Sequence, residues 1–242
     1  MDLHVINLDR STERLQEFRR DNAHLPEIKR RSAIDGSTVD RRQLVEAKVI
    51  SDDLPYTNGA IGNALSHISF WNLAKGADVP ITICEDDAIL HGEFLDLAPR
   101  LIASAPADWD LIMWGWNFDS VLMFDLMPGV SSCLAAFDQE QLRSAVRAYQ
   151  KQSLSPRLFR LFRSFGVICY TLSRAGANKL LRRCLPIRAM AVSIPGVSAK
   201  LPNFGIDIMM SSVYPDINAY VAFPPLAVTR NEHASSTVQP RR

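Results

Sequence analysis

Short apolar runs alternate with amphipathic stretches along the chain. Runs with the length and composition of buried strands occupy residues 3–8, 79–84, 110–114, 165–172 and 218–223. Apolar positions spaced three or four apart predict helices over residues 9–22, 58–75, 94–103, 138–152, 173–183 and 207–213. Residues 186–203 contain three prolines and one glycine and are expected to form a loop. Strands that alternate with helices predict an α/β fold, a single domain around a mostly parallel, Rossmann-like sheet.

The composition is that of an ordinary globular protein. The 242 residues are 47% hydrophobic and 22% charged, which excludes a disordered or collagen-like chain. A formal net charge of +1 argues against a generic nucleic-acid binder. Four cysteines without a CxxC spacing are expected to be reduced and mostly buried, as in a cytosolic protein. The sequence shows no signal peptide and no membrane-spanning apolar stretch, so a cytoplasmic location is expected.

The net charge hides a strong segregation along the chain. Residues 141–206 contain 12 Lys and Arg and no Asp or Glu, whereas the remainder has a net charge of −11. Such a split points to an anionic partner. Residues 157–163 place Arg at every third position between large apolar pairs, a pattern typical of an interfacial segment. We therefore expect peripheral contact with an anionic membrane through residues 143–188, the alternative being a solvated helix face whose Leu and Phe pack in the core.

The most informative polar feature is the run Glu85-Asp86-Asp87, which follows directly on a predicted strand. In an extended chain residues i and i+2 face the same way, so Glu85 and Asp87 should converge with Asp86 on the opposite side. In an open α/β sheet, ligands bind beyond the carboxyl ends of the strands. Clustered carboxylates suit Mg²⁺ or Mn²⁺, which are often shared with substrate phosphates. The alternative is a solvated acidic turn.

Several segments, in order along the chain, resemble one known family. They are residues 6–11 with Glu13-Arg14, 33–36, 59–67 with Trp71, 82–88 with Phe94, 108–112 with Gly115, 166–181, 224–228 and 235–237. Together they resemble glycosyltransferase family 25, the lipooligosaccharide and procollagen galactosyltransferases, over about residues 3–237. The sequence departs from the family at Asn63, where many members carry Cys, and at residues 190–203, which have no obvious counterpart.

The resemblance implies a GT-A fold, with residues 1–237 as the glycosyltransferase domain and 238–242 as a polar tail. It also implies an inverting transfer of a hexose, commonly galactose, from a UDP-sugar with the help of Mn²⁺ or Mg²⁺. The acceptor would be a cell-envelope glycan such as lipooligosaccharide. The competing hypotheses are a non-catalytic relative that binds a glycan or a membrane, and a metal-dependent phosphoesterase. Five scattered histidines speak against the phosphoesterase, which would need more ligands.

Metal and base candidates follow from this resemblance. A cation would stabilise the charge of the departing diphosphate, and Asp87 is the first candidate ligand, followed by Glu85 and Asp86. His233 could complete the metal site from the C-terminal tail, although a His in a polar tail is often only solvated. Inversion requires a general base for the acceptor hydroxyl, and Asp207 is the best candidate. The alternative for Asp207 is a helix N-cap.

Other residues are candidates for contacts with the nucleotide-sugar. An arginine fork suits a diphosphate, and Arg10 and Arg14 follow the first predicted strand. The remaining candidates are Asn7, Asp35, Gly36, His67, Glu85 and Asp86. Structural alternatives stay open for three of these groups: solvated arginines, a simple turn at Asp35-Gly36, and a packed helix histidine at His67.

Overall fold

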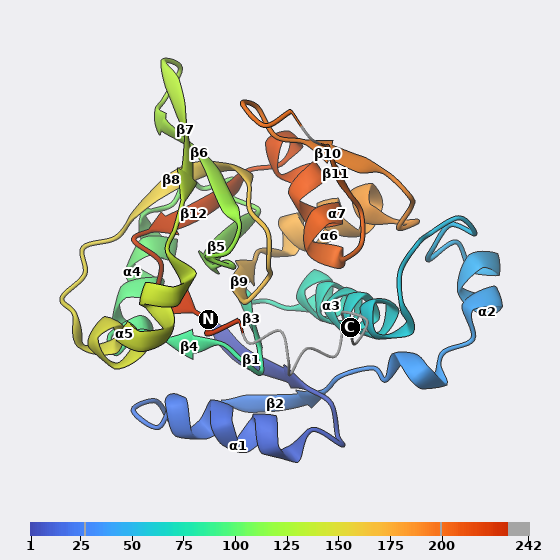
Figure 1. Cartoon of the computed structure of the whole chain (residues 1–242), viewed down its shortest axis with the longest axis horizontal. Coiled ribbons are helices and arrows are strands. Elements are labelled where there is room, and N and C mark those ends of the chain that lie inside the picture. The colour runs from blue at the N-terminus through green and yellow to red at the C-terminus, as the bar shows by residue number, and fades with distance from the viewer. Residues whose placement is uncertain (27, 199, 232–242) are drawn as a thin grey trace.

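The computed structural model describes residues 1–26, 28–198 and 200–231 of the chain (Figure 1). Its helices are α1 (Thr12–Asp21), α2 (Arg41–Glu46), α3 (Asn58–Gly76), α4 (Phe94–Ser104), α5 (Gln139–Lys151), α6 (Arg174–Cys184) and α7 (Ile206–Val213), with short 3₁₀ turns η1 (Gly36–Thr38) and η2 (Tyr214–Asp216). Its strands are β1 (Asp2–Asn7), β2 (Lys29–Ser32), β3 (Ile81–Glu85), β4 (Ile89–Leu90), β5 (Leu111–Gly115), β6 (Val121–Met127), β7 (Ser131–Ala136), β8 (Arg157–Arg163), β9 (Cys169–Leu172), β10 (Ala191–Ser193), β11 (Lys200–Pro202), β12 (Ala219–Phe223) and β13 (Ala227–Val228).

One sheet dominates the fold. In the described residues it has nine strands in the order β2-β1-β3-β9-β5-β12-β8-β6-β7. β1 pairs in parallel with β2 and β3, and β5 pairs in parallel with β12. β9 lies antiparallel between β3 and β5, and the remaining pairings are also antiparallel. Five of the first six strands in this order therefore point the same way, which brings the carboxyl ends of β1 and β3 to one edge.

The two faces of the sheet are set by the alternation of side chains along its strands. In β5, Leu111 and Met113 belong to the core under α3, α6 and α7, whereas Ile112 and Trp114 belong to the core that includes Phe94 of α4. Both faces are apolar because helices cover both, which explains the continuous apolar runs in the sequence. The α3 helix is buried over most of its surface. These layers hold β1, β3 and α3 in fixed positions around the site.

The expected α/β fold with a Rossmann-like sheet is confirmed, and so are the main predicted helices. The prediction of a loop over residues 186–203 is wrong, because this segment contains the antiparallel hairpin β10–β11. Residues 157–163 are not a helix but strand β8, in which Leu161 is buried. Arg160 donates to Asn218 Oδ1 at 2.8 Å, and Arg163 donates to backbone carbonyls. Two of the three arginines in this strand are therefore bonded within the protein.

The β6–β7 hairpin extends away from the rest of the fold at the top of Figure 1 and exposes Leu126, Met127 and Val130. The four cysteines are free, and three of them are buried, as expected. No helix in the described part of the chain is long and apolar enough to cross a membrane.

Candidate active site

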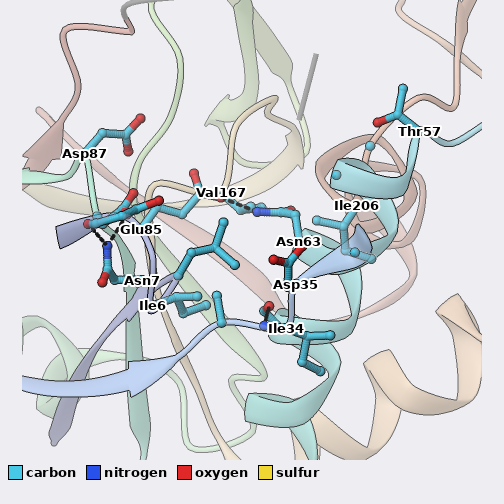
Figure 2. Close-up of a pocket in the computed structure, with 18 of the residues that line it drawn as sticks. Ile6, Asn7, Ile34, Asp35, Thr57, Asn63, Glu85, Asp87, Val167 and Ile206 are labelled. Carbon is cyan, nitrogen blue, oxygen red and sulfur yellow. Dashed lines mark hydrogen bonds between the residues drawn. The ribbon is translucent and has the colours of Figure 1, made fainter. Parts of the chain in front are cut away.

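A cavity of about 850 Å³ opens at the edge of the sheet where β1 and β3 end. Its walls come from segments far apart in the sequence: residues 6–14, 33–37, 55–66, 85–87, 117, 166–167, 204–207 and 231. Figure 2 shows Asp87 and Glu85 at one side of the cavity and Ile206 and Thr57 at the other, with Asn63 and Asp35 between them. The site therefore lies at the carboxyl ends of parallel strands, where open α/β sheets bind ligands.

Asp86 is held by a fixed set of donors. Asn7 Nδ2, at the end of β1, donates to Asp86 Oδ2 at 2.7 Å. Arg14 Nε, from the first turn of α1, donates to Asp86 Oδ1 at 2.9 Å, and its Nη2 donates to the same oxygen. Burial by itself would lower the pKa of Arg14, but the hydrogen bond and charge of Asp86 raise it above its ordinary value. Asp86 is thus a structural anchor that fixes Arg14 at the cavity wall.

Glu85 is the last residue of β3 and points into the same cavity. Its Oε1 accepts a hydrogen bond from Asn63 Nδ2 at 2.9 Å and lies 3.4 Å from His67 Nε2. Burial alone would raise the pKa of Glu85, but the contacts with His67, Asn63 and Arg14 outweigh burial and hold it below its ordinary value. His67 is itself completely buried and also contacts the Tyr170 hydroxyl at 2.9 Å. Glu85 is therefore an ionised carboxylate that Asn63 and His67 hold in position.

Asp87 has fewer partners among the described residues than its two neighbours have. Its Oδ1 is buried and accepts no hydrogen bond from the described residues. Its Oδ2 lies 3.7 Å from Arg14 Nη2, beyond hydrogen-bonding distance. Burial, together with the negative charge of Glu85, raises the pKa of Asp87 to about 7. A buried carboxylate oxygen without a donor is the arrangement that a cation would stabilise.

Asp207 lies in the first turn of α7, directly after Ile206, and lines the cavity. Its Oδ2 accepts a hydrogen bond from the Gly166 amide at 2.9 Å. Gly166 has a φ of +81°, and a Cβ there would lie 2.5 Å from Asn117 Oδ1, so a glycine is required. Burial raises the pKa of Asp207, against the opposing effect of these backbone hydrogen bonds. The N-cap of α7 is Gly205, so the predicted N-cap role of Asp207 is wrong.

The segment around Asp35 and Gly36 forms another wall of the cavity. Asp35 caps η1 through its side chain, and Arg10 forms an ion pair with it across the cavity rim. Gly36 packs against α3 so closely that a Cβ on it would lie 1.6 Å from the Asn58 carbonyl oxygen. This backbone contact fixes the first turn of α3 at the cavity wall.

The structure brings together most of the residues singled out from the sequence. The cavity is lined by Asn7, Arg10, Arg14, Asp35, Gly36, Glu85, Asp86, Asp87 and Asp207. His67 is the exception, since it lies beneath Glu85 and does not line the cavity. His233 lies outside the described residues, as does the 238–242 tail. The expectation that Asp86 points away from Glu85 and Asp87 is wrong, because β3 ends at Glu85 and strand alternation ends with it.

Several lining residues are not among the site residues expected from the sequence. They are Thr57, Asn63, Asn117, Gly166, Phe204 and Asn231. Asn63, which departs from the pattern of the family that the sequence resembles, donates to Glu85 Oε1. Its position within α3 gives no hint of that contact. Only the fold brings these residues to the carboxylates.

The acidic residues fit a divalent cation that is shared with a ligand. In the described part of the chain, no three His, Cys, Asp or Glu side chains are grouped to hold a metal ion by themselves. Asp86 is occupied by Asn7 and Arg14, which leaves the buried Oδ1 of Asp87 as the oxygen without a donor. Mg²⁺ is commonly bound through one or two carboxylates, waters and substrate phosphates. Asp87 therefore fits as a protein ligand to a cation that a diphosphate would help to bind.

Comparison with known proteins agrees with this geometry. A family model described as glycosyltransferase family 25 (LPS biosynthesis protein) matches residues 1–194. The chain belongs to glycosyltransferase family 25. The match includes the acidic run and the β1 and α3 walls of the cavity but ends before Phe204 and Asp207. No curated protein matches the chain.

Membership in glycosyltransferase family 25 gives the protein a transferase role in lipopolysaccharide biosynthesis. A glycosyltransferase of this kind takes a nucleotide-sugar donor and a glycan acceptor. The expected family is therefore confirmed, and the cavity is the place where donor and acceptor would have to meet.

Proposed function

We propose that the protein is a metal-dependent, inverting hexosyltransferase of GT-A type that moves galactose from UDP-galactose to a lipooligosaccharide-like glycan. The observation that carries the proposal is a cavity lined both by Asp87, whose buried Oδ1 accepts no hydrogen bond from the described residues, and by Asp207 from a distant segment. A direct displacement needs these two functions on opposite faces of the transferred sugar. We propose residues 1–237 as the catalytic domain.

The side of the cavity near β1 and β3 suits the nucleotide diphosphate. Arg14 is held in place by Asp86 and offers a cationic group beside the acidic run. Arg10 lies at the rim with Asp35. A guanidinium binds phosphate oxygens in a forked geometry, and its fixed position reduces the entropy lost on binding. Asn7 and Gly36 complete this wall, and His67 supports it from beneath through Glu85.

The acidic run is proposed to hold the divalent cation. Asp87 would supply the direct ligand, with Glu85 beside it and His233 as a candidate ligand from the tail. When bound, the cation would stabilise the negative charge that develops on the departing diphosphate. Mn²⁺ and Mg²⁺ both suit carboxylate ligands.

Asp207 is proposed as the general base. The Gly166 amide orients its carboxylate, and burial raises its pKa toward the range in which a base works at neutral pH. In this arrangement Asp207 accepts the proton of the acceptor hydroxyl as the oxygen attacks the anomeric carbon. The bond to the diphosphate breaks on the opposite face, so the anomeric configuration inverts.

The test is UDP release and galactose transfer from UDP-galactose, measured after EDTA treatment and again with MnCl₂. We expect wild type to require the metal, and Asp87→Asn to lower turnover by about 100-fold because the cation loses its direct ligand. Asp207→Asn should lower transfer by about 100-fold while UDP-galactose binding, measured by calorimetry, persists. Asp78→Asn is the matched control, because Asp78 is exposed and outside the cavity. Undetectable UDP-galactose binding by wild type with MnCl₂ present would refute the proposal.

A further inference from the structure

The wall of the cavity beside Asp207 carries an exposed aromatic ring. Phe204 is 56% exposed and lines the cavity. The other exposed large hydrophobic residues of the described chain, which include Val79, Val130 and Val197, do not line it. Ligand pockets are commonly lined by apolar and aromatic side chains, so an exposed ring on the cavity wall offers apolar surface to a ligand.

The exposure of Phe204 is imposed by its neighbours in the chain. Asn203 is fully buried, accepts a hydrogen bond from the Tyr56 hydroxyl at 2.7 Å, and donates to the Arg188 carbonyl at 2.8 Å. On the other side, Gly205 begins α7 and Ile206 is buried. Because both flanking segments are anchored in the core, the backbone of Phe204 is fixed and its ring is presented to the cavity.

The groups around Phe204 are those that recognise a sugar. Asp207, three residues later, offers a carboxylate that is held by the Gly166 amide. Asn117 lies against Gly166 and adds an amide group to the same wall. The basic residues of the cavity, Arg10 and Arg14, belong to the segment after β1, near Asp86. The Phe204 wall therefore combines a flat apolar surface with hydrogen-bonding groups, and the described residues contribute no Lys or Arg side chain to it.

We propose that Phe204 is the stacking platform for the acceptor sugar, which places the acceptor pyranose on the Asp207 side of the cavity. This inference rests on the proposed glycosyltransferase function. A pyranose has one face made of C–H groups, which is buried favourably on an aromatic ring, and a rim of hydroxyls that needs polar partners. Stacking on Phe204 brings the ring rim to Asp207, where a hydroxyl can transfer its proton. The donor sugar and the uracil base also have flat faces, and the experiment separates them from the acceptor.

The experiment compares wild type with Phe204→Ala, Phe204→Trp and Val197→Ala. Val197 is an exposed apolar residue of the neighbouring segment that does not line the cavity, so it is the matched control. Binding of UDP and of UDP-galactose is measured by calorimetry with MnCl₂. Acceptor binding is measured as retention on an array of bacterial lipooligosaccharide core oligosaccharides, with UDP and MnCl₂ present.

We expect Phe204→Ala to weaken glycan retention by about tenfold while the Kd values for UDP and UDP-galactose stay unchanged. Phe204→Trp should retain the glycans, because it keeps an aromatic face, and Val197→Ala should behave as wild type. Since Phe204 is exposed, the melting temperature of Phe204→Ala should equal that of wild type, which excludes a folding defect.

Each other outcome overturns the inference in a recognisable way. Weaker UDP binding by Phe204→Ala would assign the ring to the base, and weaker UDP-galactose binding alone would assign it to the donor sugar. Two results would refute the role of Phe204 in acceptor binding without refuting the proposed function. One is equal glycan retention by Phe204→Ala and wild type, and the other is no glycan retention by a wild type that binds UDP-galactose. Failure of wild type to bind UDP-galactose would remove both.

Discussion

At the scale of single residues, the protonation of the Asp87 carboxyl links the site to the stability of the folded protein. Its pKa is raised from 3.8 to about 7 by burial and by the charge of Glu85, so the folded state holds this proton more tightly than the unfolded chain does. The associated stabilisation is complete below about pH 4 and is lost as the pH rises through about 7. We therefore expect the melting temperature of the metal-free protein to fall between pH 5 and pH 8, and Asp87→Asn to reduce that fall.

Differential scanning fluorimetry in EDTA at pH 5 and pH 8 measures this effect. Asp78→Asn removes an exposed carboxylate outside the cavity and should leave the fall unchanged. An equal fall in wild type and Asp87→Asn would show that another group carries the pH dependence. Addition of MnCl₂ at pH 8 should raise the melting temperature of wild type more than that of Asp87→Asn, because a ligand that binds the folded state stabilises it.

At the scale of elements, the sequence predicted those parts of the fold whose apolar pattern is continuous. The strands β1, β3, β5 and β12 and the helix α3 are buried, so their sequences show it directly. The hairpins β6–β7 and β10–β11 were not predicted, because their side chains are largely exposed or irregularly buried and give no clear period. The acidic run was predicted from its position after β3, but its partners could not be. Arg14 and Asn63 reach Asp86 and Glu85 through packing that no local pattern encodes.

The close contact between α3 and the segment around Asp35 can be tested by its effect on the stability of the fold. A Cβ on Gly62 would lie 2.5 Å from both Gly36 N and the Ile34 carbonyl oxygen, so two backbones meet without room for a methyl group. Gly62→Ala should lower the free energy of unfolding by about 1–3 kcal/mol, because overpacking forces the two elements apart. The same displacement moves Gly36 at the cavity wall and should weaken UDP binding.

Urea denaturation and calorimetry of the same samples test this expectation. Gly76→Ala is the matched control, because a Cβ at the end of α3 meets nothing within 4 Å. Alanine is a better helix former than glycine, so this control should keep or slightly raise stability. Equal stability of Gly62→Ala and Gly76→Ala would contradict the close backbone contact.

At the scale of the whole molecule, ion pairs within the fold partly neutralise the excess of basic residues in the segment 141–206. Several basic residues of the segment 141–206 have partners inside the protein. Arg174 pairs with Asp78, Lys179 with Asp110, and Arg183 with Asp216. Arg188 and Lys200 are exposed and belong to the segment that leads to Phe204. If the acceptor is attached to a lipid, we expect the surface that carries these two residues to face an anionic membrane.

We therefore expect sedimentation with vesicles that contain phosphatidylglycerol, weakened by added salt and absent with neutral phosphatidylcholine vesicles. Each basic residue near such a surface contributes about 1 kcal/mol, so reversing the charge of two should lower the partition coefficient by at least about 30-fold. The variant Arg188→Glu/Lys200→Glu tests this. The variant Arg42→Glu/Lys75→Glu makes the same change of charge at exposed positions outside the basic segment and should sediment as wild type. Equal loss in both variants would show that net charge alone governs binding, and no loss in either would remove the membrane contact through this segment.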